Sequence, residues 1–147
     1  MSNSRQFQRQ RGRSPGASFV QIPHFVLESA QWASMDPIAL QLLMELVRQY
    51  KGNNNGDLSA TPDSLGLRNS RWNSRSVLYG RLRWLEQHGW IVKTRQGGKH
   101  LGCCLYAVTF WPINACPEKH PCSQETKPSH MWKNANSVPP HGTRRTA

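Results

Sequence analysis

Acidic residues are scarce in this chain: eight Asp and Glu stand against 19 Lys and Arg, and the formal net charge is +11 over 147 residues. Long apolar runs are missing as well, and the N-terminus has no apolar segment of the kind that a signal peptide needs. A strong basic excess without a membrane-inserting segment favours nucleic acid as the partner, and a basic protein that is merely soluble is the alternative. We expect a cytoplasmic, nucleoid-associated protein that does not bind membranes.

Motifs of catalysis and of cofactor binding are also missing, because the sequence holds no glycine-rich phosphate loop, no HExxH and no GxSxG. The neighbours Cys103 and Cys104 would point to opposite faces of a strand, which is untypical of a disulfide framework. Four residues near the C-terminus have a spacing that matches no standard zinc pattern: Cys116, His120, Cys122 and His130. We predict no enzyme and no metal or other cofactor, and no small-molecule ligand is evident from the sequence.

The distribution of apolar residues divides the chain into three parts. Residues 1–18 consist mainly of Arg, Gln, Ser and Gly, and residues 114–147 are rich in Pro, Ser, Lys, Asn and His, so both ends lack the side chains that a core requires. We predict a flexible basic arm over residues 1–18, a folded domain over 19–113 and a disordered tail over 114–147. The arm carries Arg5, Arg9, Arg11 and Arg13.

Residues 73–90, NSRSVLYGRLRWLEQHGW, show the clearest helical period. At about 100° per residue, three leucines share one side: Leu78, Leu82 and Leu85. Asn73 and Ser74 are typical N-cap residues, and Gly89 suits a left-handed C-cap, so both ends of a helix are marked. The opposite side carries Asn, Ser, Tyr and Arg, which are donors suited to base edges and phosphates. We therefore predict a DNA recognition helix.

The residues before this helix predict its support. Asp36-Pro37 is typical of a helix start, and we expect a scaffold helix to about Tyr50, with an apolar face of Ala39, Leu42, Leu43 and Leu46. The turn GNNNG follows, and residues 57–60 suit a short strand. Thr61-Pro62-Asp63 repeats the helix-start pattern, which predicts a short helix before a turn over 68–72.

The residues after Gly89 predict a hairpin. Residues 90–96 and 101–111 suit two antiparallel strands, and Gly97-Gly98 suits the turn between them. The tip of this hairpin carries several basic residues, so it can lie against a polyanion.

This order of elements resembles the winged helix-turn-helix class of DNA-binding domains. The passages at 53–60 (NNNGDLSA), 72–98 and 105–113 (LYAVTFWPI) look like small helix-turn-helix proteins of bacterial prophages, plasmids and integrated elements, over roughly residues 24–113. The resemblance implies an α+β fold with three helices and a small antiparallel sheet that ends in a hairpin wing. It also implies sequence-specific binding of double-stranded DNA, often as a homodimer, with the wing on the backbone or minor groove.

A recognition helix presents its N-terminal half to base edges. The candidate base-reading residues are therefore Asn73, Arg75, Ser76 and Tyr79, and for Asn73 helix capping alone is an equal alternative. The candidate contacts to the DNA backbone are Arg68, Arg71, Arg83, Lys93, Arg95 and Lys99, each with an ordinary solvated cation as the alternative. The arm arginines suit a minor groove, although RNA or no partner fits their composition equally.

Two residues near the helix leave questions open. Gly80, in its middle, costs about 1 kcal/mol relative to alanine, so it either permits close approach to DNA or simply weakens the helix. Trp72 precedes the helix and suits either core packing or stacking on a base.

The function that we expect from these observations is transcriptional regulation of a mobile element. A replication-initiation or origin-binding accessory protein of a plasmid or phage is the alternative that keeps the DNA binding. A winged-helix module for protein interaction is the second alternative, because a fold alone does not define a function.

Overall fold

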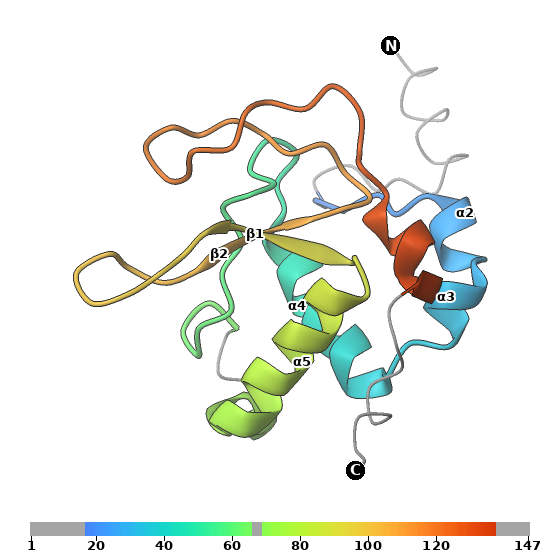
Figure 1. Ribbon diagram of the computed structural model, residues 1–147, viewed down its shortest axis with the longest axis horizontal. Coiled ribbons are helices and arrows are strands. Elements are labelled where there is room, and N and C mark those ends of the chain that lie inside the picture. The colour runs from blue at the N-terminus through green and yellow to red at the C-terminus, as the bar shows by residue number, and fades with distance from the viewer. Residues whose placement is uncertain (1–16, 66–68, 138–147) are drawn as a thin grey trace.

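The computed structural model describes residues 17–65 and 69–137 and confirms the α+β class (Figure 1). The helices are α2 (His24–Leu27), α3 (Ala30–Ala33), α4 (Pro37–Gln49) and α5 (Arg75–Gln87), with two 3-10 helices, η1 (Ser70–Asn73) and η2 (Met131–Ser137). The strands are β1 (Ile91–Arg95) and β2 (Leu105–Val108), which pair antiparallel. Within the described ranges, no helix combines the length and the apolar character that crossing a membrane requires.

Helices α4 and α5 contact each other and supply much of the core. The buried residues of α4 are Ala39, Leu42, Leu43, Leu46 and Val47, and those of α5 are Leu78, Leu82 and Leu85. Asp36 caps α4 by accepting a hydrogen bond from the Ala39 N–H at 3.0 Å, and its Oδ2 also lies 2.8 Å from Arg81 Nε. The predicted scaffold helix and the inward leucines of residues 73–90 are thereby confirmed.

The C-terminus of α5 turns the chain directly into β1. Gly89 has φ +76°, its N–H bonds to the Glu86 carbonyl at 3.1 Å, and the Trp90 N–H bonds to the Leu85 carbonyl at 3.0 Å. This pair of bonds is a Schellman motif, which needs a left-handed residue at the position of the glycine. The predicted C-cap is confirmed.

The sheet is smaller than the sequence predicts. Ile91 pairs with Val108, and a bulge between Lys93 and Arg95 interrupts the register. The strand expected over residues 57–60 is reduced to one bridge, in which Leu58 and Tyr106 exchange two backbone hydrogen bonds of 3.2 and 2.8 Å. Beyond the paired strands, the hairpin continues as loop to a bridge between Gly98 and Gly102.

Residues 61–65 form a turn, so the short helix predicted to begin at Thr61 is not found in this segment. The Thr61 N–H donates to Ser64 Oγ at 2.9 Å, and the Ser64 N–H donates to Thr61 Oγ1 at 3.2 Å. Side chains that bond to the nearby backbone in this way compete with helix formation. The turn leads toward η1, and residues 66–68 lie outside the described residues.

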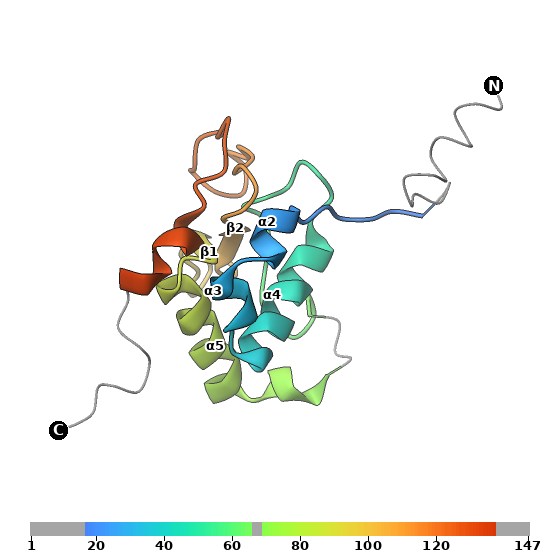
Figure 2. The same ribbon diagram turned by 90° about the vertical axis from the view of Figure 1, so that its right-hand side faces the viewer.

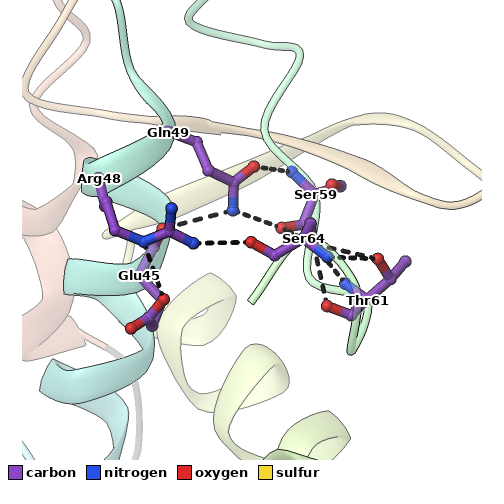
Figure 3. A network of polar contacts seen from close by, with 6 residues as sticks. All are labelled: Glu45, Arg48, Gln49, Ser59, Thr61 and Ser64. Carbon is purple, nitrogen blue, oxygen red and sulfur yellow. Dashed lines mark hydrogen bonds and ion pairs between the residues drawn. The ribbon is translucent and has the colours of Figure 1, made fainter. Parts of the chain in front are cut away.

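Polar contacts hold this turn against α4 (Figure 3). The Gln49 side chain accepts from the Ser59 N–H at 3.0 Å and donates to the Ser59 carbonyl at 2.8 Å. Arg48 donates to the Ser64 carbonyl at 2.7 Å and pairs with Glu45 at 3.2 Å. The turn therefore packs on the scaffold helix as a short helix would.

Asn55, in the GNNNG turn, is a fully buried polar residue whose side chain connects the turn to the end of β2. Its Nδ2 donates to the carbonyls of Val108, Trp111 and Pro112 at 2.9 to 3.1 Å, and its Oδ1 accepts from the Val108 N–H at 2.8 Å. The Asn55 side chain thus provides hydrogen-bond partners for backbone groups at the C-terminal end of β2 and just beyond it. The sequence predicted only a turn here.

Residues 114–134 pack on the domain, so the prediction of a disordered tail does not hold for them. The Asn114 N–H bonds to the Asn55 carbonyl at 2.8 Å, and Trp132 is 2% exposed and stacks on Trp90 at a centroid distance of 5.2 Å. The segment crosses the domain and ends in η2 beside α2 and α3 (Figures 1 and 2). A single large aromatic anchors a segment that is otherwise poor in apolar residues. Residues 138–147 lie outside the described residues.

Replacing Asn55 by alanine is expected to lower the free energy of unfolding by about 3 kcal/mol or more, because three buried carbonyls and one N–H lose their partner. Denaturant unfolding measures this change. Asn53→Ala, which changes an exposed asparagine of the same turn, is the control and should stay within about 0.5 kcal/mol of the wild type. Equal stability of the two variants would contradict the stabilising role of the Asn55 hydrogen bonds.

Replacing Trp132 by alanine is expected to cost about 3 kcal/mol, since the ring is buried against Trp90. Thermal melting and near-ultraviolet circular dichroism measure the loss. Lys127→Ala, at an exposed position of the same segment, is the control. A Trp132→Ala chain that melts like the wild type would show that the segment is not part of the folded domain.

Candidate nucleic-acid interface

One side of α5 faces outward and holds four exposed candidate residues, Arg75, Ser76, Tyr79 and Arg83, and Gln87 is also exposed near the C-terminal end of the helix. Tyr79 is 56% exposed, whereas Leu78 and Leu82, its neighbours on the helix, are each 4% exposed. The buried leucines therefore leave the donor-bearing side of the helix open to a partner. Three of the four residues are candidates for base reading, and Arg83 lies one turn beyond Tyr79.

Asn73 is the last residue of η1 and is exposed. The N-cap of α5 is Ser74, whose Oγ lies 3.5 Å from the Val77 N–H, so helix capping by Asn73 is wrong. Asn69 caps η1 by accepting from the Arg71 N–H at 2.9 Å. The base-reading role of Asn73 stays a prediction.

Trp72, also in η1, is 3% exposed and belongs to the core cluster. Of the two uses that the sequence left open, core packing is the one observed. Stacking on a base would require the ring to leave the core.

The arginines around α5 differ in what their side chains contact. Arg71 donates to Gln41 of α4, and Arg81 pairs with Asp36, so these two connect α5 and η1 to the scaffold. Arg83 is exposed. Arg68 and the arm residues Arg5, Arg9, Arg11 and Arg13 lie outside the described residues.

The hairpin presents two exposed lysines, Lys93 and Lys99, and one arginine that is engaged internally. Arg95 donates to the Cys103 carbonyl from Nη2 at 2.7 Å and from Nε at 3.1 Å, and to the Lys119 carbonyl from Nη1 at 3.3 Å. This guanidinium clamps the two sides of the hairpin to the segment that crosses it. Its position differs from the outward one expected for a contact to the DNA backbone.

The hairpin tip and the start of α5 point away from α2, α3 and η2. In Figure 1 the hairpin tip lies at the left and η1 with the start of α5 at the lower left, whereas α2, α3 and η2 lie at the right, on the side that faces the viewer in Figure 2. Residues 61–117, which include the turn over 61–65, α5 and the hairpin, contain eight Lys and Arg and two acids, Asp63 and Glu86. A region with so little negative charge attracts a polyanion.

A cleft of about 360 Å³ lies between α5, residues 60–61 and the hairpin, where its lining extends to Gly98 and Gly102 beside the tip. Tyr79 and Leu82 line it from the helix, and Cys104 and Tyr106 line it from the hairpin. Burial raises the pKa of the Tyr106 hydroxyl, and Cys104 and Glu86 raise it further, so this hydroxyl stays protonated. The cleft thus brings Tyr79 of α5 and residues of the hairpin to one hollow.

Among the Cys and His residues near the C-terminus, Cys116, His120 and Cys122 contact one another through backbone groups and the His120 ring, whereas His130 packs elsewhere. His120 Nδ1 accepts from the Cys122 N–H at 3.2 Å with its ring buried, and His130 packs edge-on against Phe25. Over the described ranges, no three His, Cys, Asp or Glu side chains lie together in a way that could hold a metal ion. All four cysteines, which include Cys116, are free thiols.

No family model, curated protein or solved structure matches this chain. The resemblance to helix-turn-helix proteins of mobile elements therefore stays a prediction that depends on the residues alone.

Sequence reasoning missed the internal role of Arg95 and the packing of residues 114–134. The sequence held no signal for the first, because the φ of +78° at Gly102 and the 2.9 Å between a Cβ there and Arg95 Nη2 are seen only in the structure. The turn predicted at Gly97-Gly98 is also misplaced: Gly98 bridges to Gly102, and the turn lies at residues 99–101.

Arg95→Lys keeps the charge but loses the forked donation to the Cys103 carbonyl, and is expected to lower the free energy of unfolding by about 1 to 2 kcal/mol. Amide hydrogen exchange in residues 98–104 should become faster. Lys99→Ala, at the exposed tip, is the matched control and should leave both measurements unchanged. If Arg95→Lys behaves like Lys99→Ala, the clamp is contradicted.

Proposed function

We propose that this protein binds double-stranded DNA in a sequence-specific manner, with the exposed side of α5 in the major groove. The hairpin, through Lys93 and Lys99, contacts the sugar-phosphate backbone. The observation that carries the proposal is that Tyr79, on the exposed side of α5, lines a cleft together with residues of the basic hairpin, in a region that has eight Lys and Arg and two acids. Asn, Arg, Ser and Tyr side chains can bond to base edges and phosphates, and a helix of this size fits the major groove.

The fold that accompanies this proposal is a variant of the winged helix-turn-helix. The turn over residues 61–65 together with η1 takes the place of the first helix, and the hairpin of β1 and β2 is the wing. Two observations support it: Arg48 of α4 bonds to Ser64 of the turn while Gln49 bonds to Ser59 just before it, and η1 contacts α5. The unit before the recognition helix is thus anchored on the scaffold.

The task that fits a small DNA-binding domain of this kind is regulation of transcription in a mobile element. Selection of bound sequences from a random duplex pool tests the proposal. A consensus sequence, with occupancy that represses a neighbouring promoter in a purified transcription reaction, is the expected result. A consensus without an effect on transcription would favour origin binding instead, and binding without sequence preference would contradict the proposal.

The affinity for the selected duplex should fall steeply with salt, as expected when about four to eight phosphates are contacted. Arg83→Ala should weaken binding to all duplexes and reduce the slope of log affinity against log salt by about 1, because one phosphate contact is lost. Fluorescence anisotropy at several salt concentrations measures both.

Lys51→Ala is the matched control, since it removes one exposed positive charge next to the C-terminus of α4, outside the proposed interface. Its slope should equal that of the wild type. A salt-independent affinity, or equal losses in Arg83→Ala and Lys51→Ala, would show that the exposed side of α5 is not the interface.

A further inference from the structure

Gly80 lies in the middle of α5 on its outward side. At about 100° per residue, it falls between Ser76, one turn earlier, and Arg83 and Gln87, one to two turns later, opposite the buried leucines. Glycine destabilises a helix interior relative to alanine, because it has more backbone freedom to lose. We therefore asked whether packing or backbone conformation requires a glycine at this position.

Neither packing nor backbone conformation in the free protein requires glycine at position 80. A Cβ built at Gly80 would have no atom within 4 Å, and its φ is not in the left-handed region. At Gly89 the same Cβ would lie 2.5 Å from the Met131 carbonyl oxygen, and at Gly56 it would lie 2.6 Å from His120 Nε2. Those two glycines are required by packing and backbone conformation, whereas alanine at Gly80 would be accommodated in the free protein and would strengthen the helix.

The short side chain of Ser76 indicates which contact the absence of a side chain at Gly80 permits. Ser76 lies one turn before Gly80 and is exposed, and its hydroxyl extends only one bond beyond its Cβ. Such a short donor reaches a base edge only where the helix backbone itself lies close to the floor of the groove. A side chain at position 80 would hold the backbone away from that floor.

We propose that Gly80 is the point at which α5 approaches the DNA most closely, so that its missing side chain sets the depth of the helix in the major groove. This inference rests on the proposed function. It makes Gly80 a determinant of sequence preference although it has no side chain: the depth of the helix decides whether Ser76 and Tyr79 reach the bases.

The test is a pair of measurements on Gly80→Ala and Gly80→Leu. Alanine should raise the melting temperature by about 4 °C, because helix propensity improves. The same variant should bind the selected duplex about tenfold more weakly, and leucine should weaken binding further, since the loss follows side-chain size. Binding to an unrelated duplex at low salt should change less, because it depends on phosphate contacts.

Gln87→Ala, near the C-terminal end of α5 on the same side, removes bulk instead of adding it, and should bind within about twofold of the wild type. Wild-type binding together with unchanged or tighter binding of Gly80→Ala would overturn this inference alone. A wild-type chain that binds no duplex at any salt concentration would overturn the proposed function as well, so the two failures are distinguishable.

Discussion

The packing of the leucines of α5 against α4 is the constraint on which the rest of the structure depends. Leu78, Leu82 and Leu85 are at most 4% exposed, and burying a leucine contributes about 2 kcal/mol. Their spacing allows only one rotation of the helix about its axis, and this rotation turns the donor-bearing side outward. Asp36 reinforces it, because its carboxylate caps α4 and also pairs with Arg81 of α5.

The position of the hairpin follows from the end of the same helix. The left-handed turn at Gly89 directs the chain from α5 into β1, and the hairpin that follows lines one cleft together with Tyr79 of α5. Two features far apart in the sequence then hold the sheet in place: Asn55 satisfies the backbone at the end of β2, and Trp132 covers Trp90. The arrangement of the proposed interface thus follows from the packing of the core.

Elements with a strong local signal could be predicted from the sequence, and elements formed by distant contacts could not. Helix α4, helix α5 and the C-cap at Gly89 follow from periodicity and capping residues. The helix expected at Thr61 failed because Ser64 and Thr61 bond to each other's backbone, and the tail was mispredicted because Trp132 finds its partner 42 positions earlier in the sequence, at Trp90. At the candidate site, exposure of Tyr79 and Arg83 was predictable, whereas the clamp made by Arg95 was not.

The most direct test of the central claim, that the core packing of α5 leaves its opposite side free to dock on a duplex, is the backbone amide NMR spectrum of the labelled protein during titration with duplex DNA. The account predicts that the resonances that shift belong to residues 75–83 of α5 and 93–100 of the hairpin, while those of α2, α3 and η2 stay in place. Shifts confined to α2, α3 and η2, with α5 and the hairpin unaffected, would contradict it.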